Sequence, residues 1–143
     1  MKIDSMHARD TFDLGRQCGE KAKPGQVICL YGDLGTGKTV FTQGFAEGLG
    51  ISSPVNSPTF TILQVYDEGR LPFYHFDVYR ISDPEEMFEI GFDDYIEGEG
   101  VCLIEWAGLI EEILPETRTV IHIDKDLSKG FDYRRITIEE VEE

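Results

Sequence analysis

Hydrophobic and polar positions along the 143-residue chain follow two different periods. Gln26 to Tyr31 is a short, mostly apolar run, which predicts a buried β-strand. Phe41, Phe45 and Leu49 recur every four residues, which predicts a helix with one apolar face, and Gly50 is a C-terminal stop signal. The segment between this strand and this helix is rich in glycine.

The same periods predict elements on both sides of this unit. A helix is expected over residues 10–21, with Phe12 and Leu14 or Gly15 facing inward. Further strands are expected over residues 59–66, 73–79, 101–104, 119–123 and 133–138, and short helical segments near 82–86, 91–96 and 109–114. The first two of these strands flank a turn and predict an antiparallel hairpin. Residues 139–143 are expected to be a solvated tail.

Strands that alternate with helices, together with a hairpin, predict an α/β fold. We expect a single domain over residues 1–143, built as three layers around a mixed, mostly parallel sheet. This length is sufficient for a hydrophobic core of one domain.

The glycine-rich segment carries candidate chemistry. Residues 32–39 fit the pattern G-x-x-x-x-G-K-[ST] at every fixed position. In such a loop the backbone N–H groups face a triphosphate, Lys38 reaches the outer phosphates and the Thr39 hydroxyl holds Mg²⁺. The helix N-terminus adds a partial positive charge beneath the phosphates. Strand, loop and helix are the context that the motif requires, so we expect a P-loop NTPase-like domain. The alternative is a glycine turn that binds nothing.

Hydrolysis of a triphosphate also needs a carboxylate from elsewhere in the chain. Glu105 follows a run of four apolar residues, so it is expected at the end of a buried central strand, near the phosphate loop. Asp77 lies within an aromatic strand, where a charge is costly unless it is paired or functional. The alternatives are a surface acid at Glu105 and a salt bridge between Asp77 and Arg80 or another base.

Three further features have a structural and a functional interpretation. For His75, a buried and satisfied side chain is favoured, because nothing near it forms a nucleophile pair. Trp106 is expected to pack in the core rather than to form the wall of a binding site. Residues 57–59 are either a turn or a segment that lends a hydroxyl to the γ-phosphate or Mg²⁺.

Charge and cysteine content narrow the classes of function. The formal net charge of −15 argues against direct binding of nucleic acid without a partner. The three cysteines show no C-x-x-C spacing and indicate neither a disulfide framework nor a zinc site. No apolar stretch approaches the length of a membrane span, and the N-terminus lacks a signal-peptide core. We therefore expect a cytoplasmic protein that does not contact membranes.

Four motifs occur together in one order: residues 32–39, 56–60, 75–80 and 104–106. With this set the chain resembles the TsaE family, the small bacterial ATPases needed to form threonylcarbamoyladenosine in tRNA. The resemblance implies that Thr39 and Glu105 hold Mg²⁺ and that Asp77 is the carboxylate needed for hydrolysis. It also implies ATP contacts at Asp33, Leu34, Gly35, Thr36, Gly37, Lys38, Thr39, Val40, Thr59 and Arg134.

The resemblance also implies partners. Members of the family act with a complex of the TsaD and TsaB proteins, which transfers the threonylcarbamoyl group to the adenosine beside the anticodon. Contact with tRNA would then be indirect, through that complex. Two other functions remain open at this point, a small-molecule kinase with a phosphate loop and a nucleotide switch that does not hydrolyse. No arginine-rich lid of the kind that kinases carry is visible in the sequence.

Overall fold

The protein is described here by a computed structural model that covers residues 1–33, 35–56 and 61–142. A seven-stranded sheet has the order β1-β7-β6-β2-β5-β4-β3. Its strands are β1 (Lys2–Ser5), β2 (Val27–Tyr31), β3 (Leu63–Tyr66), β4 (Phe73–Asp77), β5 (Val101–Glu105), β6 (Arg118–Lys125) and β7 (Arg134–Val141). The four central strands are parallel to one another, whereas β1, β7 and β3 pair antiparallel at the edges. This confirms the mixed sheet and the hairpin.

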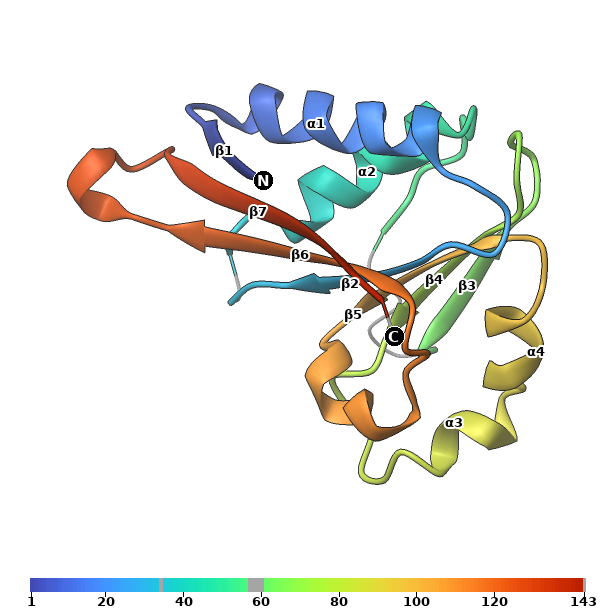
Figure 1. The fold of residues 1–143 in the computed structure, drawn as a ribbon. Coiled ribbons are helices and arrows are strands. Elements are labelled where there is room, and N and C mark those ends of the chain that lie inside the picture. Colours follow the sequence, from blue (N-terminus) through green and yellow to red (C-terminus); the bar gives the residue numbers. More distant parts are fainter. Residues whose placement is uncertain (34, 57–60, 143) are drawn as a thin grey trace.

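Helices cover both faces of the sheet, as Figure 1 shows. One face carries α1 (Ala8–Lys21) and α2 (Lys38–Gly48), and the other carries α3 (Glu86–Glu89), α4 (Phe92–Ile96) and the 3-10 helix η1 (Ala107–Ile113). A short 3-10 turn, η2 (Leu127–Lys129), lies between β6 and β7. The three predicted layers are therefore present.

Strand β2 explains why its segment is apolar at successive positions. Ile28 and Leu30 belong to the core beneath α1 and α2, whereas Val27 and Cys29 belong to the core on the opposite face. A central strand that is buried on both faces has no polar side to alternate with. The phosphate-loop segment begins where this strand ends, so a rigid element holds its entry point.

Helix α2 is packed unusually close to α1 through glycines. A Cβ atom placed on Gly15 would lie 2.2 Å from the backbone oxygen of Phe41, and one on Gly44 would lie 2.1 Å from that of Phe12. Because no side chains separate the two backbones at these positions, the helices approach until main chain meets main chain. Gly15 faces α2 and Leu14 packs against the core, so both residues that the pattern left open face inward. The packing fixes α2, whose first residues carry the candidate site.

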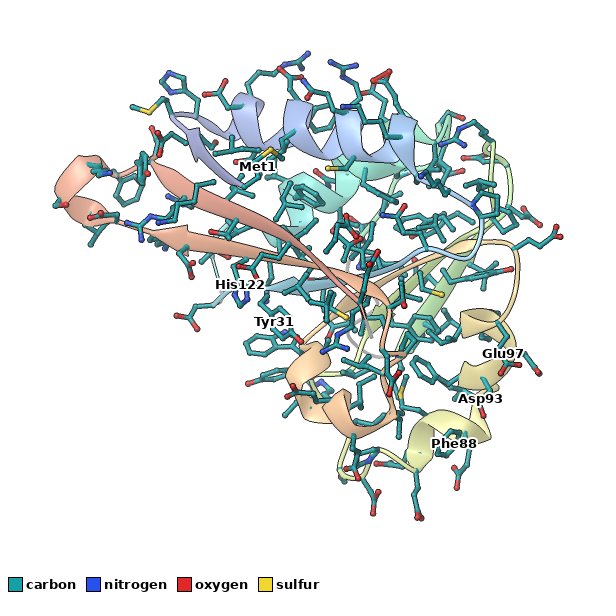
Figure 2. All side chains as sticks on the ribbon, viewed as in Figure 1. Met1, Tyr31, Phe88, Asp93, Glu97 and His122 are labelled. Carbon is teal, nitrogen blue, oxygen red and sulfur yellow. The ribbon has the colours of Figure 1, made fainter. Side chains whose placement is uncertain are left out.

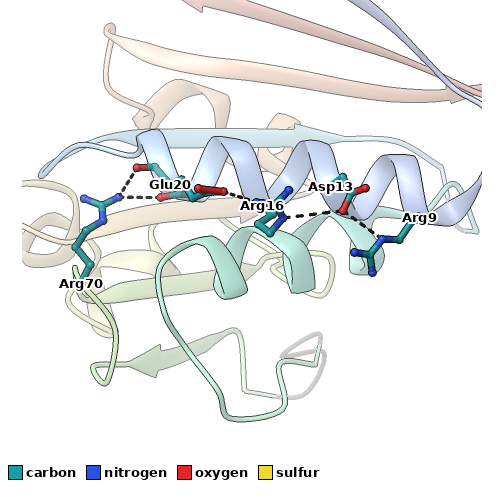
Figure 3. Close-up of polar contacts among 6 residues, drawn as sticks. Arg9, Asp13, Arg16, Glu20 and Arg70 are labelled. Atoms are coloured by element: carbon teal, nitrogen blue, oxygen red, sulfur yellow. Dashed lines mark hydrogen bonds and ion pairs between the residues drawn. The ribbon is translucent and has the colours of Figure 1, made fainter.

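The outer surface of α1 carries ion pairs between successive turns (Figure 3). Arg9 pairs with Asp13 at 3.3 Å, and Arg16 pairs with Glu20 at 2.6 Å. Exposed pairs of this kind contribute little to stability. The C-terminal end of α1 is held differently, because Arg70 donates to the backbone oxygens of Gly19, Glu20 and Ala22. Carbonyl oxygens at the end of a helix generally lack partners within it, although that of Gly19 also accepts from the Ala22 backbone N–H.

Some predicted boundaries were wrong. Strand β1 was not predicted, β3 begins at Leu63 rather than 59, and β4 ends at Asp77 rather than 79. Residues 57–60, which include the start of the expected strand, lie outside the described residues. The expected solvated tail is strand to Val141, because Glu139 and Glu140 pair with β6. No helix among the described residues is long and apolar enough to cross a membrane.

Candidate functional site

The phosphate-loop segment joins the end of β2 to the first turn of α2. Gly35 and Gly37 have φ angles of +80° and +103°, a left-handed conformation that glycine adopts without strain. At Gly32 the reason for glycine is space, because a Cβ atom would lie 2.6 Å from the Thr36 hydroxyl. Thr36 closes the turn, since its Oγ1 donates to the backbone oxygen of Asp33 at 2.9 Å.

Lys38 is the first residue of α2 and is buried, with 7% of its surface exposed. Its amine has no hydrogen-bond acceptor among the described residues and lies 4.0 Å from the centre of the Trp106 ring. Burial lowers the pKa of Lys38, whereas the charges of Glu105, Asp77 and Asp33 oppose that shift. A buried amine without an acceptor is costly, which suits Lys38 to binding an anion.

Two buried carboxylates end neighbouring parallel strands beside Lys38. Asp77 is the last residue of β4 and Glu105 the last of β5, and the two are register partners with 6% and 3% of their surfaces exposed. The Oδ1 atom of Asp77 accepts a hydrogen bond from the Tyr79 backbone N–H at 3.0 Å. Like charges this close and this buried repel each other, which favours a cation between them.

Glu105 has a specific neighbour in the sheet. The Nε2 atom of His75 lies 2.7 Å from the Oε2 atom of Glu105, and His75 is 1% exposed. The expected burial is confirmed, but the side chain is not fully satisfied, because its Nδ1 atom has no hydrogen-bond partner among the described residues. The partner of Nε2 could not be named from the sequence, because the contact depends on the register between β4 and β5.

Arg134 reaches the phosphate loop from the start of β7. Its Nε atom donates to the backbone oxygen of Thr36 at 2.8 Å, and its Nη2 atom donates to that of Gly35 at 3.4 Å. The neighbouring Arg135 instead contacts Asp126. Arg134 therefore binds two carbonyl oxygens of the loop and does not engage its backbone N–H groups.

A small pocket of about 280 Å³ lies beside the loop and is lined by Tyr31, Gly32, Asp33, Trp106, His122 and Asp124. Tyr31 and His122 stack with their ring centres 4.9 Å apart, and Figure 2 labels both. Trp106 has a left-handed backbone, with φ of 63°, and packs against Tyr79. Trp106 packs partly against the core, as expected, and its ring also lines this pocket and contacts Lys38, so the alternative interpretation holds as well.

The donor set fits Mg²⁺ bound together with a phosphate. Thr39 is exposed in the first turn of α2, followed by the half-buried Val40. No group of three His, Cys, Asp or Glu side chains within residues 1–33, 35–56 and 61–142 could hold a metal alone. Mg²⁺ commonly binds one or two carboxylates plus phosphate oxygens and water, so a shared site suits Thr39 and Glu105. Leu34 and Thr59 lie outside the described residues.

Comparison with known proteins identifies the family. The profile described as "Threonylcarbamoyl adenosine biosynthesis protein TsaE" matches residues 5–136. The chain belongs to the TsaE family. The tRNA threonylcarbamoyladenosine biosynthesis protein TsaE of Bacillus subtilis is 51% identical over 96% of this chain and 84% of its own length. That of Treponema pallidum is 44% identical over 86% of this chain and 90% of its own length.

A solved structure has the same fold. The crystal structure of Bacillus subtilis YdiB superposes with a TM-score of 0.85 and 46% sequence identity, covering 99% of this chain and 85% of that one. The mixed sheet described above is thus the fold of a relative whose structure was solved.

Proposed function

We propose that this TsaE-family chain is a Mg²⁺-dependent ATPase that takes part in threonylcarbamoyladenosine modification of tRNA. It would act in the cytoplasm, as one domain over residues 1–143, and its turnover would be stimulated by a complex of TsaD and TsaB. The observation that carries the proposal is the buried Lys38 amine, which lies beside the buried carboxylates of Asp77 and Glu105 without a hydrogen-bond acceptor among the described residues.

Each residue of the site has a distinct part in this proposal. The loop backbone binds the phosphates of ATP, and Lys38 provides their cationic partner. Thr39 and Glu105 would hold Mg²⁺, which when bound neutralises charge on the phosphates. Asp77 supplies the carboxylate that hydrolysis requires. Arg134 keeps the loop in shape through the Gly35 and Thr36 carbonyls.

Nucleotide contacts are proposed at Asp33, Leu34, Gly35, Thr36, Gly37, Lys38, Thr39, Val40, Thr59 and Arg134. Membership of the family supports a function in tRNA modification, as do relatives whose names state threonylcarbamoyladenosine biosynthesis in tRNA. The net charge of −15 disfavours direct binding to tRNA, so the partners would supply the basic surface.

One experiment tests the proposal. The pure protein is incubated with Mg-ATP, alone and with the TsaD–TsaB pair and tRNA, and phosphate release is followed. Release that rises with the partners supports the proposal. Transfer of phosphate to a metabolite would indicate a kinase instead, and intact bound ATP under every condition would indicate a switch that does not hydrolyse.

Variants separate binding from turnover at the same site. Lys38→Ala removes the cation that faces the phosphates and should weaken Mg-ATP binding in calorimetry. Asp77→Asn keeps the size of the side chain but removes its charge, so it should reduce phosphate release much more than ATP affinity. Equal losses of affinity and release in Asp77→Asn would show that Asp77 has only a structural part.

A further inference from the structure

His75 is a buried polar side chain that the proposed function does not use. It lies in the middle of β4 with 1% of its surface exposed, and its ring stacks on Phe73 with the ring centres 5.8 Å apart and the planes 8° apart. Phe73 belongs to the apolar core, so one side of the imidazole is fixed by packing. Its polar contact is with Glu105 at 2.7 Å.

The chemistry of the partner determines which atom carries the proton. An ionised carboxylate only accepts hydrogen bonds, so the hydrogen of a neutral imidazole must lie on Nε2 to make this contact. The other ring nitrogen, Nδ1, is buried without a hydrogen-bond partner among the described residues. An N–H group at Nδ1 would be left unpaired there, which is costly, so the contact with Glu105 and the surroundings of Nδ1 both place the hydrogen on Nε2.

The geometry of the sheet makes this contact selective for one oxygen of the carboxylate. His75 pairs in register with Leu103, two residues before Glu105 on the neighbouring strand. From there the imidazole engages Oε2 and does not engage Oε1. We propose that His75 is the positioning residue of Glu105: it holds Oε2 so that Oε1 is presented to Mg²⁺ bound with the nucleotide. This inference rests on the proposed function, in which Glu105 is a metal ligand.

Two amide substitutions test the contact with matched chemistry. In glutamine the amide nitrogen stands the same number of bonds from Cβ as Nε2 of histidine, whereas in asparagine it is one bond short. His75→Gln should therefore keep the hydrogen bond to Glu105, and His75→Asn should lose it. Lost hydrogen bonds to metal ligands typically reduce metal affinity by about 10–100-fold.

The readout is the Mg²⁺ dependence of binding of a non-hydrolysable ATP analogue, measured by calorimetry with Mg²⁺ and with EDTA. We expect His75→Asn to weaken Mg²⁺ affinity by about 10-fold or more while affinity in EDTA is unchanged, and His75→Gln to stay close to wild type. Wild-type Mg²⁺ affinity in His75→Asn overturns the inference. Equal losses with Mg²⁺ and with EDTA also overturn it, because they show a structural effect alone.

A second measurement begins with the wild-type protein and does not depend on whether the His75 variants fold. Imidazole ¹⁵N NMR should show the hydrogen of His75 on Nε2, and this Nε2–H resonance should shift in Glu105→Gln. The exposed His7 and His122 serve as internal controls that stay unchanged. A His75 ring protonated at Nδ1 instead would overturn the inference. If the wild type binds the analogue without any dependence on Mg²⁺, the proposed function fails rather than the positioning of Glu105.

Discussion

The close approach of α1 to α2 makes a quantitative prediction about Gly15. In Gly15→Ala the new Cβ atom would lie 2.2 Å from the Phe41 backbone oxygen, whereas ordinary contacts begin near 3.4 Å. The helices must then separate by about 1 Å, since a main-chain oxygen inside a helix cannot rotate away as a side chain can. Overpacking costs about 1–3 kcal/mol, and the upper part of that range, about 2–3 kcal/mol, applies where the new atom meets main chain.

Alanine also favours the helix, which offsets part of this cost. Replacing glycine by alanine inside a helix stabilises the helix by about 1 kcal/mol. The net destabilisation of Gly15→Ala should therefore be about 1–2 kcal/mol. For a chain of this size each kcal/mol lowers the melting temperature by about 4 °C. We therefore expect Gly15→Ala to melt about 4–8 °C below the wild type.

The assay is thermal unfolding followed by circular dichroism, with Gly108→Ala as the matched control. A Cβ atom on Gly108 would meet its nearest neighbour, the Tyr31 ring, at 3.7 Å, which is an ordinary contact. The control should melt within about 2 °C of the wild type. A Gly15→Ala protein that melts as high as the control would refute the close backbone contact between α1 and α2.

Three other predictions concern separate parts of the molecule. Trp106 lines the pocket beside the loop and contacts Lys38, so its fluorescence should change when Mg-ATP is added, and a silent spectrum would place the nucleotide elsewhere. Burial raises the pKa of Cys29 to about 11 and that of Cys102 to about 12. Neither of these two thiols should react with Ellman's reagent at neutral pH until the protein is denatured. Fast labelling of Cys29 or Cys102 in the native protein would contradict this. Hydrogen bonds from Ser53 lower the pKa of Glu68. The stability that ionised Glu68 contributes is therefore present above its pKa in the unfolded state, and it is lost as pH falls through its pKa in the folded state. The melting temperatures of wild type and Glu68→Gln should thus converge as pH falls below the ordinary pKa of glutamate, about 4.3, and a gap that persists in acid would show that charge is not the cause.

Local patterns were sufficient for the elements that form the centre of the fold. Strand β2 and helix α2 carry apolar residues at the periods that burial requires, and the loop motif between them has fixed spacing. The acids at Asp77 and Glu105 were singled out because each follows buried strand residues, and the structure places them in register. These features depend on short stretches of sequence, which is why they were predictable.

The features that were missed depend on pairing between distant segments. Lys2 pairs with Thr137 in the β1–β7 ladder, and nothing in the four residues of β1 indicates a partner so far along the chain. Glu139 and Glu140 gave the end of β7 the composition of a tail, although both lie in the strand that pairs with β6. The His75–Glu105 contact needs the β4–β5 register, and the contact between Arg134 and the loop needs the complete sheet.

The arrangement of β2 has a consequence for synthesis on the ribosome. Its two neighbours in the sheet, β5 and β6, begin at Val101 and Arg118. Arg134, which donates to the loop carbonyls, comes later in the chain. When a nascent chain has exposed only the glycine loop, it therefore lacks both the strands that flank β2 and Arg134, which binds the loop. Under the proposed function, ATP would therefore not act as an early folding template, and affinity for it should emerge only after the last strand has left the exit tunnel.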